Sequence, residues 1–250
     1  MKFSNRFLVF CIIALTFVFG FYSFAFSVSQ DEANNQGELL AELLVAGRGV
    51  VAQSLPKYKI NDPEIADKGF KPEYFKTAIN EEFKKNTGID ILAGTSAKPI
   101  SDESLNVLKT MLDASEKVCE DNQTLINMKG VGFKGFIPAS YGRMVSEIMK
   151  EKTGIVIKQT TFVFRNTYNA PDNYEQKILK DMEAPEYKKG EVISALVDGK
   201  FRVMKPIYIQ KACLSCHGDP KGEIDVAGRK KEGYKEGDLR GAISVMIDVK

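Results

Sequence analysis

The chain has 250 residues, of which 44% are hydrophobic and 27% charged, with 20 glycines, no tryptophan and one histidine. This composition excludes disorder, collagen and coiled coil, and it supplies enough apolar residues for a folded core. The 35 basic and 33 acidic residues give a net charge of +2, which indicates no bias toward nucleic acid. A single histidine excludes any metal site that needs two histidines from one chain.

The first 29 residues have the pattern of an export signal. Lys2 and Arg6 precede an uninterrupted apolar run from Phe7 to Phe26, and small residues follow before the polar segment that begins at Gln30. This order is typical of a secretory signal peptide and predicts a periplasmic or otherwise exported protein. The run is also long enough to span a membrane, so an uncleaved anchor is the alternative. We expect membrane contact only through this segment, and only if it is not cleaved.

The next part of the chain has helical periodicity. Apolar residues recur at helical spacing over about 36–55, which predicts an amphipathic helix. Residues suited to begin or end further helices follow in order: Pro72, Gly88, Ser101, Pro138 and Gly154. We therefore expect at least four helices before residue 155.

An internal repeat runs through these helices at a constant offset of 66 residues. Lys68-Gly69-Phe70 matches Lys134-Gly135-Phe136, and Thr87-Gly88-Ile89 matches Thr153-Gly154-Ile155. No gap is needed, which favours a duplicated helical unit. Two helices that pack in related ways beside one core are the alternative interpretation.

After Gly154 the pattern changes from helices to strands. The turn Asp198-Gly199 joins two strands in a hairpin, in which Pro206 requires an edge or a bulge. Asp172 and Glu175 match the capping box of a short helix before that hairpin. Helices first and antiparallel strands afterwards predict an α+β fold, with a small sheet that carries helices on one side. The expected strands are Ile155–Arg165, Ile193–Val197, Phe201–Ile209 and Leu239–Val249.

Cys213-Leu214-Ser215-Cys216-His217 is the strongest functional motif, because it matches the Cys-x-x-Cys-His pattern of c-type haem attachment. Two thiols separated by two residues reach the two vinyl groups on one edge of a porphyrin, and the adjacent histidine lies under the iron. We therefore predict one covalent haem c, with Cys213 and Cys216 as the thioether residues and His217 as the proximal iron ligand.

Three alternatives use the same cysteines. A structural zinc site would need four Cys or His ligands, which would use Cys119 together with the motif and leave none to spare. A redox dithiol would lie at the start of a helix, but Gly218, Asp219 and Pro220 follow at once. A plain disulfide leaves the adjacent histidine unexplained. The haem interpretation is therefore the one that we favour.

The sixth iron ligand has several candidates. Without a second histidine, one chain cannot supply bis-histidine ligation. Cys119 is the only thiol left outside the motif and the N-terminal segment, and it also fits a small buried hydrophobe on a helical face. An open position is a further alternative, as is a methionine, for which the candidates are Met111, Met128, Met144 and Met204.

Two further stretches, Gly132–Ala139 and Arg165–Glu175, precede the hairpin and the segment Cys213–Pro220. In this order the three stretches resemble the exported c-type haem proteins with a PAS-like fold, which also occur as sensory input domains of bacterial receptors. The resemblance covers most of residues 36–250. It implies a PAS-like antiparallel sheet flanked by long N-terminal helices, and a haem iron that can be held by His and Cys.

The resemblance also implies roles for single residues. His217 carries over by motif, whereas the cysteine carries over only as a residue type, which makes Cys119 the candidate sixth ligand.

Arg165 either pairs with a haem propionate or ends a strand and meets a surface acid. The lysine-rich stretch Lys221–Lys235 is expected to be a solvated loop, with a docking patch for an acidic redox partner as the alternative.

These observations divide the chain into a signal peptide or anchor (1–29), an N-terminal helical extension (30–98) and a PAS-like c-type haem domain (99–250). We expect a periplasmic monohaem protein that transfers electrons or senses redox state or a small gas, rather than an enzyme. Its partner would be a redox protein or a separate membrane receptor, and not nucleic acid. A haem enzyme of the peroxidase or reductase type, with an open distal site, is the alternative.

Overall fold

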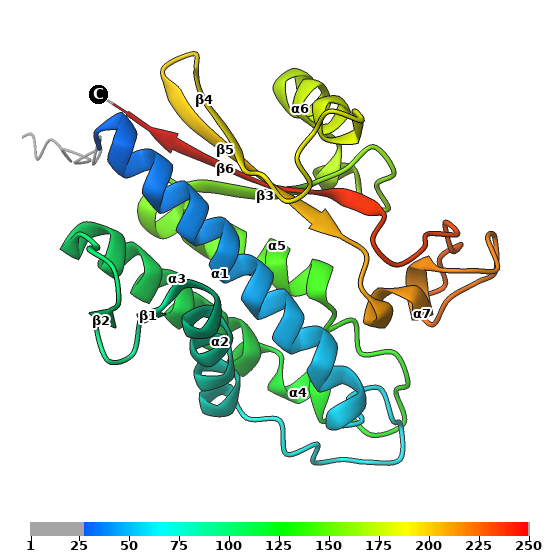
Figure 1. Cartoon of the computed structure of the whole chain (residues 1–250). Coiled ribbons are helices and arrows are strands. Elements are labelled where there is room, and N and C mark those ends of the chain that lie inside the picture. Colours follow the sequence, from blue (N-terminus) through cyan, green and yellow to red (C-terminus); the bar gives the residue numbers. More distant parts are fainter. Residues whose placement is uncertain (1–27, 250) are drawn as a thin grey trace, which may run out of the picture.

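A computed structural model describes residues 28–249, so the predicted signal or anchor at 1–29 lies almost wholly outside the described residues. Helices come first and the main sheet afterwards, which confirms the predicted α+β fold (Figure 1). The helices are α1 (Gln30–Lys57), α2 (Pro72–Thr87), α3 (Asp102–Asp121), α4 (Gln123–Ile126), α5 (Pro138–Thr153), α6 (Asn173–Glu183) and α7 (Leu214–His217), with short 3-10 turns η1 (Thr167–Asn169) and η2 (Lys211–Cys213).

The main sheet has four antiparallel strands in the order β3-β6-β5-β4. The hairpin of β4 and β5 is as predicted, and Asp198 and Gly199 both have positive φ, 50° and 75°, as its two-residue turn requires. In β5, the residues that pair with β4 end at Met204. Pro206 lies beyond them, so its missing N–H removes no bond to β4. The strands are β3 (Val156–Thr160), β4 (Ile193–Val197), β5 (Lys200–Tyr208) and β6 (Leu239–Asp248), and a separate pair consists of β1 (Ile89–Asp90) and β2 (Thr95–Ser96).

The expected strand Ile155–Arg165 is wrong in its second half. β3 ends at Thr160, and the side chains of Phe162 and Phe164 are exposed in the loop that follows. The loop turns back at once, because the Thr161 N–H donates to the Asn169 carbonyl at 3.2 Å. Because β3 ends early, Arg165 lies in a loop at the end of the sheet where β5 ends and β6 begins.

Helix boundaries follow their local signals closely. Gly88 and Gly154 end α2 and α5 in the left-handed conformation, with φ of 78° and 76°. The Ser101 hydroxyl caps α3, and Asp172 and Glu175 form the predicted capping box of α6. These short-range contacts explain why the sequence patterns located these helix ends correctly. The first helix was expected at about 36–55, but α1 begins earlier, at Gln30, where the Ser29 side chain caps it.

Helices cover both faces of the main sheet, so the expectation of helices on one side only is wrong. α1 and α5 lie against one face, and α6 lies on the other (Figure 1). Val203 and Met204 are neighbours in β5 and point to opposite faces, so each enters a different apolar cluster. The side with α1 is tightly packed, since a Cβ atom added at Gly37 would collide with Val203.

The larger apolar core extends across the expected boundary at 98/99. It joins Leu40 and Leu44 of α1 to Val145 of α5 and Ile243 of β6. α1 is long and apolar enough to cross a membrane, but half of its most apolar window is buried inside the protein. In this structure α1 is therefore a core helix that packs directly on the sheet.

The 66-residue repeat has a counterpart in space. The Asn61 side chain accepts from the Lys134 N–H at 3.0 Å, and the Asn127 side chain accepts from the Lys68 N–H at 2.9 Å. In each copy of the repeat, the asparagine side chain thus bonds to the backbone of the matching lysine in the other copy. The pair α1 and α2 corresponds to α3 and α5, and these reciprocal bonds favour the duplicated unit over a chance likeness.

Candidate functional site

The Cys-x-x-Cys-His motif lies at one end of the sheet, directly after β5. It occupies η2 and α7, and the segment 218–238 then leads back into β6 (Figure 1). The base of this excursion is closed by two backbone bonds, from the Ile209 N–H to the Asp238 carbonyl at 2.9 Å and from the Gly237 N–H to the Ile209 carbonyl at 2.8 Å. The sheet therefore provides a rigid base for the motif.

The three motif side chains are accessible at this end of the molecule. Cys213 and Cys216 are free cysteines of intermediate exposure, and the His217 side chain is 24% exposed. No disulfide joins the two cysteines, and α7 is only four residues long, which does not suit a redox dithiol at the start of a long helix. The geometry thus offers two thiols and an imidazole within one turn of chain.

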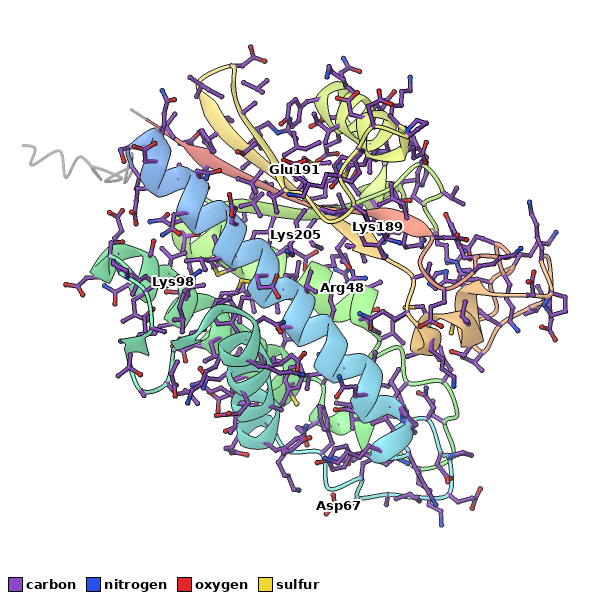
Figure 2. The ribbon with its side chains drawn as sticks, in the orientation of Figure 1. Arg48, Asp67, Lys98, Lys189, Glu191 and Lys205 are labelled. Atoms are coloured by element: carbon purple, nitrogen blue, oxygen red, sulfur yellow. The ribbon has the colours of Figure 1, made fainter. Side chains whose placement is uncertain are left out.

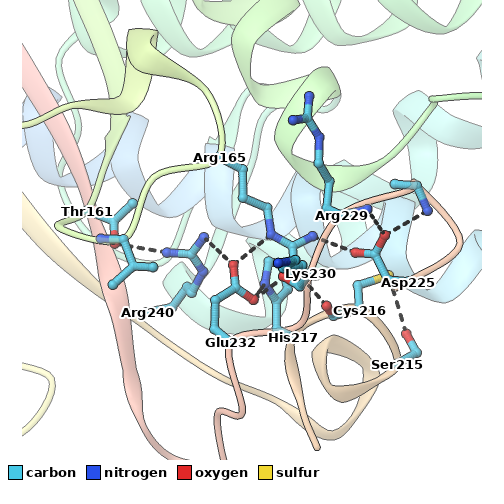
Figure 3. Close-up of polar contacts among 12 residues, drawn as sticks. Thr161, Arg165, Ser215, Cys216, His217, Asp225, Arg229, Lys230, Glu232 and Arg240 are labelled. Carbon is cyan, nitrogen blue, oxygen red and sulfur yellow. Dashed lines mark hydrogen bonds and ion pairs between the residues drawn. The ribbon is translucent and has the colours of Figure 1, made fainter. Parts of the chain in front are cut away.

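His217 is oriented by a carboxylate. Its Nδ1 lies 2.8 Å from Oε2 of Glu232 (Figure 3). Burial lowers the pKa of His217, although the hydrogen bond to Glu232 acts in the opposite direction. A neutral ring that donates from Nδ1 keeps its lone pair on Nε2, which makes no hydrogen bond within residues 28–249. This is the arrangement that orients histidine ligands in metal sites.

Glu232 is held in turn by Arg165. The guanidinium binds both carboxylate oxygens, with Nε to Oε1 at 2.6 Å and Nη2 to Oε2 at 2.8 Å. Burial would raise the pKa of Glu232, but the hydrogen bonds from Arg165 and His217 outweigh it and lower that pKa. Glu232 is therefore ionised at neutral pH. Arg240 adds a weaker ion pair at 3.9 Å.

Arg165 also fastens the loop to the motif. Its Nη1 donates to the buried Asp225 carboxylate at 2.6 Å, and its Nη2 donates to the Cys216 carbonyl at 2.8 Å (Figure 3). Of the two sequence interpretations, the structure shows the pairing with acids, although Asp225 is buried rather than on the surface. A contact of Arg165 with a haem propionate stays a prediction.

The lysine-rich stretch Lys221–Lys235 is more than the solvated loop that we expected. Asp225 and Glu232 belong to it and point inward, while Lys231 and Glu223 pair with each other near the surface. The sequence reasoning missed Glu232 because 15 residues separate it from His217 and no motif links such positions. The only available signal was an acid within a basic stretch.

Cys119 lies in a different part of the molecule. It is buried on α3, and its Sγ accepts from the Gln123 amide at 3.5 Å. Burial raises the pKa of Cys119 to about 12, so the group is a neutral thiol in this environment. The structure does not bring it into contact with the motif, and its role as sixth ligand stays a prediction. The methionine candidates also stay predictions: Met111 and Met204 are buried in the core, Met144 packs against it, and Met128 is exposed.

The donors that the structure brings together fit a covalent haem better than a bare metal ion. Within residues 28–249, no three His, Cys, Asp or Glu side chains converge as ligands for a metal ion. A structural zinc site would require four such ligands. The motif instead presents one imidazole with a free Nε2 and two accessible thiols, which is the donor set of a c-type haem.

Comparison with known proteins gives the family. The profile of the Tll0287-like family (Tll0287) matches residues 27–248. The chain belongs to the Tll0287-like family. No curated protein matches it. Among solved structures, the crystal structure of the cyanobacterial heme-protein Tll0287 is 18% identical and aligns with a TM-score of 0.42 over 60% of this chain and 97% of that chain. The Tll0287-like match extends from the start of α1 to the end of β6, with the motif inside it.

Proposed function

We propose that this member of the Tll0287-like family binds one haem covalently through Cys213 and Cys216, with His217 as an axial ligand. The observation that carries the proposal is the pairing of His217 Nδ1 with Glu232, which leaves Nε2 available beside two free cysteines. Membership of the Tll0287-like family supports it, because Tll0287 is a cyanobacterial heme-protein.

The chain has what covalent attachment requires. Each cysteine S–H adds across one vinyl double bond, so that sulfur bonds to one vinyl carbon, hydrogen goes to the other, and nothing is lost. Cys213 is the N-cap of α7 and Cys216 lies within it, so about one helical turn separates the thiols. Both must be reduced for this addition, and both are free in the structure.

The protein serves in electron transfer or in sensing of redox state or a small gas. When bound, the haem supplies a reversible one-electron centre. The ionised Glu232 makes His217 a stronger donor, which favours the oxidised form of that centre. The basic start and apolar run of residues 1–29 support an exported, periplasmic location. The partner is a redox protein or a separate membrane receptor.

Expression with a cytochrome c maturation system tests the proposal. Mass spectrometry of the purified protein should show the polypeptide plus one haem, and a pyridine haemochrome spectrum should show two thioether bonds. The double variant Cys213→Ser/Cys216→Ser should show the polypeptide mass alone. His217→Ala should keep the added mass but change the absorption spectrum. Bare polypeptide from the unaltered chain would refute the proposal.

Carbon monoxide separates the roles. If the reduced protein binds CO and its Soret band shifts, the sixth position is open or labile, as sensing or a peroxidase-type reaction requires. An unshifted band would identify a closed site and a simple electron carrier. Turnover of peroxide by the CO-binding protein would then favour the enzyme over the sensor.

A further inference from the structure

Arg48 of α1 is a partly buried cation without a counterion. Within residues 28–249 its guanidinium makes no ion pair and no hydrogen bond. Arg165 and Arg240 near the motif are, by contrast, both paired with a carboxylate, that of Glu232. An unpaired charge in such a position is costly for the folded protein, so its presence requires an explanation.

The register of α1 on the sheet brings Arg48 to the motif. Gly37 of α1 lies against Val203 of β5, and further along Glu42 pairs with Lys205 at 2.9 Å. The helix and the strand thus run side by side, and the next turns of α1 meet the segment that follows β5. α1 indeed contacts η2, which contains Cys213. Figure 2 shows Arg48 at this part of α1.

The electrostatic surroundings of Arg48 agree with this placement. Burial lowers the pKa of Arg48 to about 10, which still leaves it charged at neutral pH. The groups that act on its charge are Cys213, Arg240 and Tyr141. None of these is a carboxylate, and the Tyr141 hydroxyl is already paired with Ser115 at 2.8 Å. The positive charge beside Cys213 is therefore uncompensated.

We propose that Arg48 binds a propionate carboxylate of the haem attached at Cys213. This inference rests on the proposed function. Arg165 is poorly suited to that role, because its Nε, Nη1 and Nη2 already donate to Glu232, Asp225 and the Cys216 carbonyl. Arg48 offers five free donors in a planar fork, which matches a carboxylate. The haem carboxylate would supply the anion that the described residues lack.

The redox potential of the holoprotein tests this pairing. Arg48→Met removes a positive charge near the propionate, which should lower the midpoint potential and move the propionate inflection in its pH profile to higher pH. Arg48→Lys keeps the charge without the fork, so both shifts should be smaller. Arg143→Met is the matched control, because Arg143 is partly exposed on α5 and pairs with Glu147. It should leave the potential and the inflection unchanged.

The haem-free protein gives an independent readout. In the Cys213→Ser/Cys216→Ser background, Arg48→Met replaces an unpaired cation by an apolar chain, so the thermal midpoint should rise or stay constant. A fall would assign Arg48 a structural role and overturn the inference. Full haem loading with unchanged potential and inflection in both Arg48 variants would also overturn it, while the proposed function would stand. Failure of the unaltered chain to acquire haem would refute the proposed function itself.

Discussion

Glu232→Gln is the substitution that tests the site most directly. The carboxylate is 13% exposed and receives three close donors, two from Arg165 at 2.6 and 2.8 Å and one from His217 at 2.8 Å. Glutamine is nearly the same size but has one oxygen and one NH₂ group. At least one of the three donors would then face another donor, and Arg165 would lose one of its two counterions.

The expected cost follows from these contacts. A hydrogen bond to a charged group contributes about 1.5–3 kcal/mol to stability. Arg165 keeps Asp225 as a partner at 2.6 Å. The loss of stability should therefore stay below the cost of about 3–5 kcal/mol for a buried ion left without any partner. We expect Glu232→Gln to lower the free energy of unfolding by about 2–3 kcal/mol, or the thermal midpoint by about 4–12 °C for a chain of this size.

Denaturant unfolding of the haem-free protein measures this cost, with Glu223→Gln as the control. Glu223 belongs to the same loop and pairs with Lys231, but its side chain is 52% exposed, so its loss should cost less than about 1 kcal/mol. In the holoprotein, Glu232→Gln should also raise the midpoint potential. A differential effect of about 1 kcal/mol on the oxidised form corresponds to about 40 mV for one electron. Equal losses of stability in both variants would refute the reasoning.

Three further outcomes follow from the structure. Gly47→Ala should destabilise the protein by about 1–3 kcal/mol in thermal unfolding, because its Cβ would overlap the Tyr141 ring, whereas Gly49→Ala meets nothing within 4 Å and should be neutral or stabilising. Cys119→Ala tests the candidate sixth ligand: thiolate ligation should give a changed ferric absorption spectrum, and an unchanged spectrum would leave Cys119 as the buried neutral thiol of the haem-free structure. Burial lowers the pKa of His217 in the folded protein, so as pH decreases the unfolded state binds this proton first. The free energy of unfolding of the haem-free protein should therefore fall as pH decreases from about 7 through the usual histidine range. A flat pH profile would contradict this.

Local contacts explain which elements could be predicted from sequence. The caps at Ser101 and Asp172 bond within three residues of themselves, and the left-handed Gly88 and Gly154 end their helices through the adjacent turn. The hairpin depends on the two residues at its tip. All of these signals lie inside windows that a sequence pattern can cover.

The wrong expectations concern contacts between distant segments. The apolar Phe162 and Phe164 favoured a longer strand, but pairing ends at Thr160 and Ala242 although β6 extends back to Leu239, because the Thr161 N–H bonds to the Asn169 carbonyl instead. Likewise, an amphipathic pattern shows that α6 has one buried face without showing which side of the sheet that face covers. Periodicity reports the buried side of an element and not its neighbour.

The same distinction divides the site. The motif residues lie within five positions and carry their own chemical signature, whereas the residues that hold them come from other segments: Glu232 from the loop before β6 and Arg165 from the loop after β3. Arg48, which we propose for the haem propionate, comes from α1. What unites them is the end of the sheet, where β5 leads into the motif, β6 begins and β3 has already stopped. Because β3 stops at Thr160, Arg165 is a loop residue, and from that loop it pairs with Glu232 and Asp225. Glu232 and Arg165, which orient His217, are therefore positioned by where the strands end, which no short stretch of sequence encodes.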